Sequence, residues 1–110
     1  MARAGKPVLT HVTYRPKKGK EQDLFALVKK HWPTLKKTGL VTADPATVYR
    51  ATNKRTGDVY FVEIFSWRDE KASGIAHQTP EVMAVWEPMG PIMAGMEIAA
   101  IEPVGARARR

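Results

Sequence analysis

The sequence predicts an α+β domain of the ferredoxin-like class, in which a βαββαβ order of elements places both helical regions on one face of an antiparallel sheet. Segments with strand-type alternation and segments with helix-type periodicity follow one another in that order. Residues 59–67 are apolar on both alternating faces, as expected of a strand covered on both sides. A chain of 110 residues suffices for one such core, so we expect a single domain.

The first part of the chain is expected to form one strand and one long helix. Residues 8–14 (VLTHVTY) alternate and are bounded by prolines, which predicts a strand. The helix is expected over residues 20–38, where apolar side chains recur at helical spacing. Its stripe contains Leu24, Leu27, Val28, His31 and Leu35, widened by Phe25 and Trp32. Because proline lacks a backbone donor, Pro33 is expected to kink this helix or split it after Trp32.

The middle of the chain predicts a β-hairpin. Residues 46–52 (ATVYRAT) form its first strand, residues 53–57 its loop and residues 59–67 its long second strand. In this second strand Val59, Phe61, Phe65 and Trp67 share one face, and Glu63 is a single carboxylate in the same row. The hairpin therefore brings one acid into an otherwise apolar layer.

The last part of the chain predicts two short helical segments and a final strand. Asp69 is expected to cap a helix that carries Ala72, Ile75 and Ala76 on one side. Thr79 is the expected N-cap of the next segment, with Pro80 in its first position. That segment presents Val82, Val85, Trp86 and Met89 on one face, and residues 96–102 form the final strand.

The net charge of +7 is concentrated at the chain ends. Arg3, Lys6, Arg107, Arg109 and Arg110 lie in terminal segments, and subtracting these five from +7 leaves +2 for the body. We expect residues 1–6 and 105–110 to be flexible basic tails around a domain that spans residues 7–104. The remaining lysines fit the solvated face of the first helix without interleaved aromatic residues, so a nucleic-acid partner is not expected.

Several classes of protein are excluded by composition. The chain has no cysteine, which rules out disulfides and thiolate metal sites. No apolar run approaches the roughly 20 residues that cross a bilayer, and the N-terminal MARAGKPV lacks the apolar core of a signal peptide. We therefore expect a cytoplasmic protein without a membrane partner.

The doubly apolar strand also predicts self-association. Two helical regions can cover only one face of the sheet, and the other face would leave aromatic and branched residues in water. A homodimer that stacks sheet on sheet would bury that face. We therefore expect a homodimer through the sheet.

Short motifs resemble a known superfamily over about residues 7–104. They are PKKGKE at 16–21, YFV at 60–62, and WRDEKA at 67–72 followed by His77 and Pro80. With them the chain resembles the dimeric α/β barrel superfamily, and within it the antibiotic-biosynthesis monooxygenase-like domains. Trp67, Ala72 and His77 match the W-x-x-x-x-A-x-x-x-x-H pattern of that broader group.

The resemblance implies a homodimer with a pocket in each subunit, between sheet and helices. Some relatives oxidise aromatic polyketides or quinols with molecular oxygen and no cofactor, and others cleave heme. The heme-cleaving relatives use an Asn on the first strand with a Trp and a His on the second helical region. Here the first strand has no Asn, and those other positions fall near Ala76 and Trp86. Heme cleavage is therefore not expected, and no cofactor is implied.

Three ionisable residues are the candidate catalytic groups. His31 lies within the apolar stripe of the first helix, as a proton-relaying pocket residue or as a core histidine bonded to a backbone carbonyl. Glu63 would cost several kcal/mol to bury unless it is paired, and His11 and Arg50 on flanking strands are its candidate partners. Glu63 could serve as a general base or join an ion pair on the dimer face. His77 is the third candidate, although an ideal helix points it away from the pocket.

Several aromatic residues are candidate substrate contacts. Trp67 and Trp86 could stack a flat ligand or simply fill the core. Trp32 and His11 are further substrate-binding candidates. No pair of histidines or carboxylates has the i,i+4 spacing of a helical metal site, so no metal is expected.

Two functional hypotheses follow. The first is a cofactor-independent monooxygenase-like enzyme that acts on a small aromatic or quinone-like molecule in an apolar pocket between sheet and helices. The second is a non-catalytic dimeric module that binds a small hydrophobic molecule.

Overall fold

The computed structural model describes residues 5–105, so most of both predicted basic tails lies outside the described residues. The strands are β1 (Val8–Pro16), β2 (Thr47–Thr52), β3 (Val59–Trp67) and β4 (Met93–Ala100). The helices are α1 (Glu21–Lys37), α2 (Ala72–Ala76) and α3 (Pro80–Met89), and a 3₁₀ turn, η1 (Gly90–Ile92), leads into β4. The predicted α+β class with βαββαβ order is confirmed, α2 and α3 together forming the second helical region.

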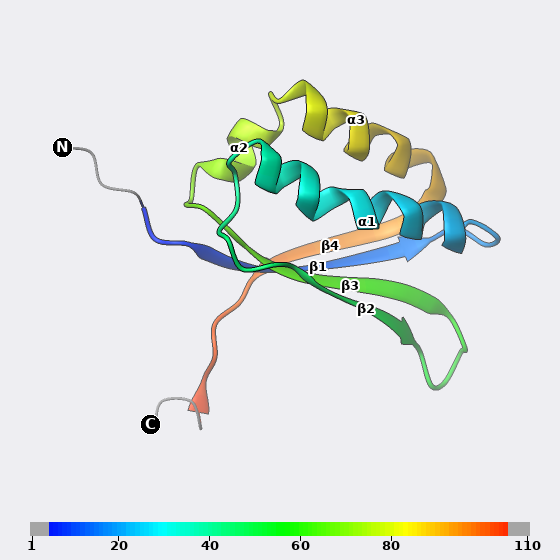
Figure 1. Cartoon of the computed structure of the whole chain (residues 1–110). Helices are drawn as coiled ribbons and strands as arrows, with labels where there is room; N and C mark the ends of the chain where they lie inside the picture. The colour runs from blue at the N-terminus through cyan, green and yellow to red at the C-terminus, as the bar shows by residue number, and fades with distance from the viewer. Residues whose placement is uncertain (1–4, 106–110) are drawn as a thin grey trace.

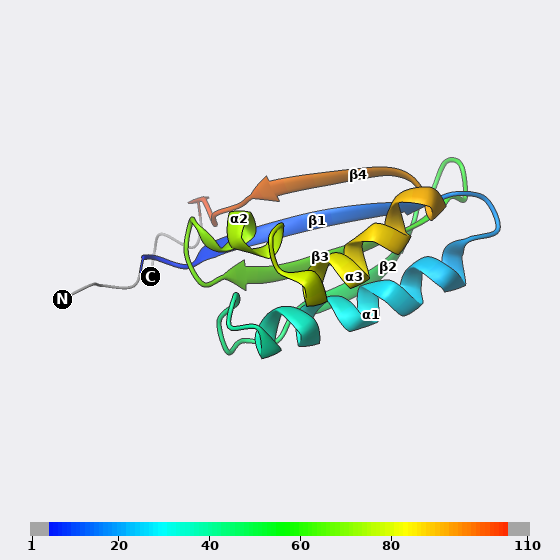
Figure 2. The same cartoon turned by 90° about the horizontal axis from the view of Figure 1, so that it is seen from above.

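The four strands form one antiparallel sheet in the order β2-β3-β1-β4. All helices lie on the same face of this sheet, as Figures 1 and 2 show. The central strands β1 and β3 are therefore the ones whose side chains meet the helices. Their pairing register sets Val12 opposite Glu63 and Tyr14 opposite Phe61.

Helix α1 packs the predicted stripe against the sheet. Leu24, Val28, His31 and Leu35 are buried. The expected break after Trp32 does not occur, because the helix runs without interruption through Pro33 to Lys37. Proline removes only one backbone bond there, and the buried turns on either side stay packed. Within the described part of the chain, no helix is long and apolar enough to cross a membrane.

Helix α2 differs from its predicted face. Ala72 and Ala76 are fully buried, but Ile75 is 45% exposed and does not share their side. The two alanines are one helical turn apart and allow close packing, whereas Ile75 is turned away from that contact. Asp69 accepts the Lys71 amide 3.0 Å from its Oδ1 and so caps the turn that precedes α2. Helix α3 begins as predicted, with Thr79 at its N-cap.

Strand β4 starts and ends earlier than the predicted 96–102. It pairs along β1 from Met93, opposite Pro16, to Ala100, opposite Thr10. The hydrogen bonds to β1 continue just past the end of β4, since the Ile101 amide donates to the Leu9 carbonyl at 2.9 Å.

The sheet face opposite the helices is uncovered. Leu9 is 37% exposed and Tyr49 is 54% exposed. Tyr60, Val62 and Ile64 alternate with the helix-facing residues of β3 and are half-buried. We call these five residues the open face. It is the apolar surface that the sequence predicts on the second side of the sheet.

Candidate active site between the sheet and the helices

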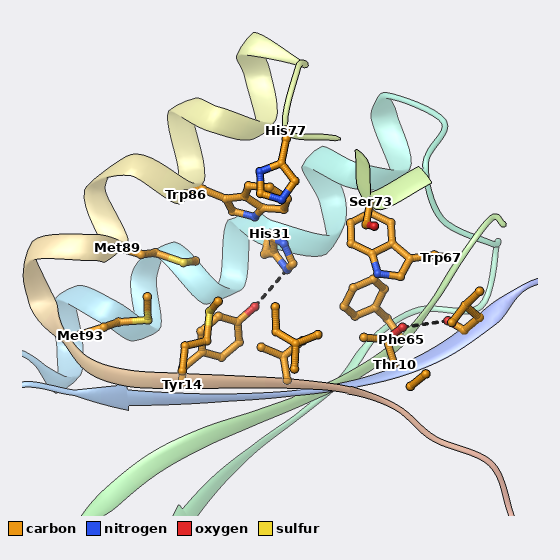
Figure 3. Close-up of a pocket in the computed structure, with 15 residues that line it drawn as sticks. Thr10, Tyr14, His31, Phe65, Trp67, Ser73, His77, Trp86, Met89 and Met93 are labelled. Atoms are coloured by element: carbon orange, nitrogen blue, oxygen red, sulfur yellow. Dashed lines mark hydrogen bonds between the residues drawn. The ribbon is translucent and has the colours of Figure 1, made fainter. Parts of the chain in front are cut away.

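A cavity of about 390 Å³ lies between the helical layer and the strands β1, β3 and β4. Its volume falls in the lower part of the range for small-molecule sites, about 300–1,000 Å³. Figure 3 shows its walls, with Tyr14 and His31 on one side and Phe65 and Trp67 on the other. The remaining lining residues are Val8, Thr10, Val12, Ser73, His77, Trp86, Met89, Met93, Met96, Ile98 and Ala100.

The walls of this cavity are mostly apolar and aromatic. The His77 imidazole meets the Trp86 indole edge to face at 4.8 Å between ring centroids. Trp86 in turn lies 6.0 Å from the His31 ring. On the other side Phe65 and Trp67 meet edge to face at 5.1 Å. These aromatic surfaces suit a flat ligand.

A buried hydrogen-bond network joins three ionisable side chains behind the cavity wall. The Tyr14 hydroxyl donates to Glu63 Oε1 at 2.6 Å, and His31 Nδ1 lies 2.8 Å from the same oxygen. Tyr14 Oη and His31 Nδ1 are 3.2 Å apart. Glu63 is fully buried, and the other two are at most 3% exposed. Tyr14 and His31 therefore converge on one oxygen of a buried acid.

The fold brings these residues together from three elements. Val12 lies directly opposite Glu63, so Tyr14, two residues further along β1, is its diagonal neighbour on the same face. His31 reaches the pair from above, because it lies in the buried stripe of α1. The arrangement depends on strand register and on helix placement together.

Burial and the adjacent Glu63 carboxylate raise the pKa of Tyr14 well above its ordinary value, the burial being the larger cause. Its hydroxyl therefore keeps its proton and acts as a donor. One proton cannot serve two acceptors, and the shorter contact directs it to Glu63 rather than to His31.

When Tyr14 is replaced with phenylalanine, we expect the free energy of unfolding to fall less steeply as the pH rises into the alkaline range. Tyr14 in the unfolded chain ionises near pH 10, whereas in the folded protein its raised pKa keeps the proton bound. Above pH 10 the folded state therefore holds one proton more than the unfolded state. The contribution of Tyr14 to the free energy of unfolding is complete below pH 10 and falls as the pH rises, by up to about 1.4 kcal/mol per pH unit. Urea unfolding of wild type and Tyr14→Phe between pH 8 and 11 measures this. Equal slopes for the two proteins would contradict the expectation.

Two atoms of the network lack a partner. Among residues 5–105, His31 Nε2 and Glu63 Oε2 are buried and make no hydrogen bond. Buried polar atoms are normally satisfied, so such exceptions call for a reason, and a role in chemistry is one. The His31 side chain lines the cavity, but its Nε2 is itself buried, so a ligand could reach that atom only after neighbouring side chains shift.

The site brings together four of the residues singled out from sequence. His31, His77, Trp67 and Trp86 all line the cavity. His77 does so because it ends α2 as its C-cap, and there it packs on Trp86 instead of pointing away. Glu63 faces the helices and not the open face, but it touches the cavity only through Tyr14 and His31. It therefore lies behind the cavity wall, bonded to His31.

Other candidates lie elsewhere, and the partners expected for Glu63 need correction. His11 alternates with the cavity-facing residues of β1, pairs with Ile64 and Ala99, and lies on the uncovered side of the sheet. Arg50 instead forms an exposed ion pair with Glu21 at 3.5 Å. Trp32 packs beside the core and does not line the cavity. Sheet alternation explains the first result, since His11 is one residue out of step with Val12.

Tyr14 is the residue of the site that the sequence analysis missed. Tyr14 ends the predicted first strand two residues after Val12, so alternation alone places it on the same face. What the sequence lacks is the register that makes it a neighbour of Glu63. The methionines of the wall come from two elements, since Met89 ends α3 whereas Met93 and Met96 lie in β4.

Within residues 5–105 no three histidine or carboxylate side chains are grouped to hold a metal ion. The network of Tyr14, Glu63 and His31 offers only two ligands of the usual kinds, and they bond to each other.

Solved structures share this fold over most of the chain, whereas no family model and no curated protein sequence matches it. An antibiotic biosynthesis monooxygenase aligns with a TM-score of 0.67 at 15% identity, covering 89% of this chain and 99% of the other. SnoaB, a cofactor-independent oxygenase from Streptomyces nogalater, aligns with a TM-score of 0.63 at 13% identity, covering 87% and 94%. A NIPSNAP family protein from Agrobacterium tumefaciens gives 0.64 at 11%, covering 96% and 93%.

These matches confirm the predicted resemblance at the level of fold. The chain has the ferredoxin-like fold that is also found in an antibiotic biosynthesis monooxygenase and a NIPSNAP family protein. At identities of 11–15% the likeness concerns the architecture and not the reaction.

Proposed function

We propose that this protein is a cofactor-independent monooxygenase-like enzyme that acts on a small aromatic or quinone-like molecule. The observation that carries the proposal is the buried Tyr14–Glu63–His31 network in the wall of an apolar cavity. The match to a cofactor-independent oxygenase supports the same class of reaction. The substrate would occupy the cavity between the aromatic pairs His77–Trp86 and Phe65–Trp67.

In this proposal His31 is the general base. Oxygen chemistry without a cofactor requires an electron-rich substrate that a base has made anionic. Once the substrate has displaced the side chains that bury it, His31 Nε2 takes the proton of a ring hydroxyl, and the Glu63 carboxylate stabilises the imidazolium through Nδ1. Tyr14 holds Glu63 in place by donating to the same oxygen. The apolar walls exclude water, so the anion stays reactive toward oxygen.

Oxygen uptake tests the reaction directly. Purified protein is incubated with a panel of hydroquinones and anthrones, and oxygen consumption is followed with an electrode. Combining His31→Ala with Glu63→Gln is expected to lower the rate by about 100-fold or more, because a positioned base contributes about 10²–10⁴. Uptake by wild type that does not exceed that of the double variant would refute the proposal.

The mostly apolar cavity also suits a second function, a non-catalytic module that retains a hydrophobic molecule. The few polar groups in its walls favour simple ligand holding as well as chemistry. Native mass spectrometry distinguishes the two, since a binding module would carry an unchanged ligand at a fixed stoichiometry.

The assembly we propose is a homodimer formed through the open face. Tyr49 and Leu9 are exposed there, and the half-buried Tyr60, Val62 and Ile64 extend the same apolar surface. The sheet-on-sheet dimer expected from the sequence would cover this surface. Each subunit would keep its own cavity, because the helices and the open face are on opposite sides of the sheet.

A further inference from the structure

Three aromatic rings lead from the rim of the cavity to the buried network. The His77 imidazole lies 4.8 Å from the Trp86 indole, and that indole lies 6.0 Å from the His31 imidazole, measured between ring centroids. Figure 3 shows His77 and Trp86 together above His31. His77 is exposed, Trp86 is half-buried and His31 is buried. The Trp86 indole therefore stands between the exposed imidazole and the buried one.

Trp86 is also the most accessible of the rings that surround His31. Around the imidazole lie Tyr14 at 6.3 Å, Phe65 at 5.7 Å and Trp86 at 6.0 Å between ring centroids. Tyr14 and Phe65 are 2% and 3% exposed, so either ring would lose close packing if it moved. Nδ1 of His31 is bonded to Glu63, which leaves Nε2 as the nitrogen that a ligand would have to reach. The least costly way to that nitrogen is to move Trp86.

Helix α3 holds the backbone of Trp86 in place and leaves its side chain free to turn. The helix is anchored because it buries Val82, Val85 and Met89. Trp86 is not among these buried residues, and its indole borders a cavity of about 390 Å³ instead of close-packed core. A change of side-chain rotamer therefore moves the indole while α3 stays where it is.

Helix α2 holds His77 only weakly. It has five residues, its buried side chains are those of Ala72 and Ala76, and Gly74 lies between them. A segment with few buried apolar contacts opens at a low cost in free energy. His77 follows as the C-cap of this helix and packs on Trp86. His77 is thus a contact that can be released without disturbing the core.

We propose that Trp86 is a gate, a side chain whose position controls access to His31, and that His77 is the latch that keeps this gate closed. In the closed state the indole lies against His31, and Nε2 is buried. In the open state the indole has moved away and Nε2 faces the cavity. The inference rests on the proposed function in treating His31 as the group that a ligand must reach, but it concerns access and not turnover.

Chemical labelling of His31 measures this access. Diethyl pyrocarbonate acylates the imidazole nitrogens that it can reach, and peptide mass spectrometry identifies the labelled histidine. The reagent is kept below one label per molecule, and N-acetylhistidine in the same solution corrects for its hydrolysis. In the wild type we expect His31 to be labelled at least about tenfold more slowly than the exposed His77. Equal rates for the two would overturn the inference.

Trp86→Ala is expected to raise the labelling rate of His31 at least about tenfold, because the reaction no longer waits for the gate to open. Trp32→Ala is the matched control. It removes another half-buried indole, one that packs beside the core and does not line the cavity, and it should leave the rate unchanged. Circular dichroism checks the fold of each variant. A folded Trp86→Ala protein with the wild-type rate, or an equal rise in Trp32→Ala, would refute the gate.

His77→Ala tests the latch at an exposed position, where the substitution leaves the core intact. Loss of the edge-to-face contact with Trp86 should shift the equilibrium towards the open state by about two- to tenfold. We expect the labelling rate of His31 to rise by the same factor. An unchanged rate would overturn the inference, and this variant decides it even where Trp86→Ala does not fold.

These measurements separate the inference from the proposed function. Slow labelling of His31 in the wild type that Trp86→Ala and His77→Ala both accelerate would support the gate, even if no substrate consumed oxygen. Oxygen uptake by a wild-type protein whose His31 is labelled as fast as His77 would refute only the gate.

Discussion

Replacing Glu63 with alanine is expected to lower the free energy of unfolding by about 3–5 kcal/mol. The substitution removes the oxygen to which Tyr14 and His31 both bond, so two buried polar groups lose their partner. It also opens a cavity at a fully buried position. Chemical denaturation at pH 7, with the denaturant dependence checked for change, measures the effect.

Two control variants sharpen this prediction. Glu63→Gln keeps the volume and a carbonyl acceptor, and we expect it to cost about 1–3 kcal/mol, less than alanine. Glu97→Ala removes a carboxylate whose ion pair with Arg15 is exposed, and it should change stability by less than about 1 kcal/mol. A Glu63→Ala variant as stable as Glu97→Ala would show that the buried network contributes nothing to folding.

Replacing Ile64 with lysine is expected to convert the proposed dimer into a monomer. Ile64 lies in the middle of β3 on the open face, between His11 of β1 and Thr47 of β2. A sheet-on-sheet dimer would bury an ammonium group there without a partner. We expect the dissociation constant to rise at least about 1,000-fold, equivalent to about 4 kcal/mol. Sedimentation velocity at micromolar concentration, with circular dichroism to check the fold, measures the change.

Ile75→Lys is the matched control for this variant. Ile75 is an exposed isoleucine on α2, on the helical side of the sheet. It should leave the dimer intact. A wild-type protein that sediments as a monomer, or an Ile64→Lys variant that keeps the wild-type mass, would contradict the proposed assembly.

The architecture could be predicted because it depends on local patterns. Alternation along β3 places Phe61, Glu63 and Phe65 on one face whatever the sheet around them, and the structure has them under the helices. Helical spacing likewise places His31 in a buried stripe. Element ends were less predictable. The start of β4 at Met93 depends on its pairing with Pro16 of β1, so that boundary belongs to two strands.

The candidate site could be predicted only in part. Glu63 and His31 stood out in the sequence because each is a polar residue in an apolar row. Their contact with each other was not foreseen, and His11 and Arg50 were named as partners for Glu63 instead. Tyr14 carried no signal of its own, since a tyrosine at a strand end is ordinary core.

Residue patterns alone were thus enough to establish the ferredoxin-like class, the two-sided apolar sheet and the burial of an acid and an imidazole. The folded chain added the meeting of Tyr14, Glu63 and His31 around one oxygen atom, the place of His77 beside Trp86, and the side of the sheet on which His11 lies. The physical reason is one of range. Side-chain periodicity is a property of neighbouring residues, whereas a hydrogen bond of 2.6 Å between residues 49 positions apart depends on strand register and helix packing across the whole domain.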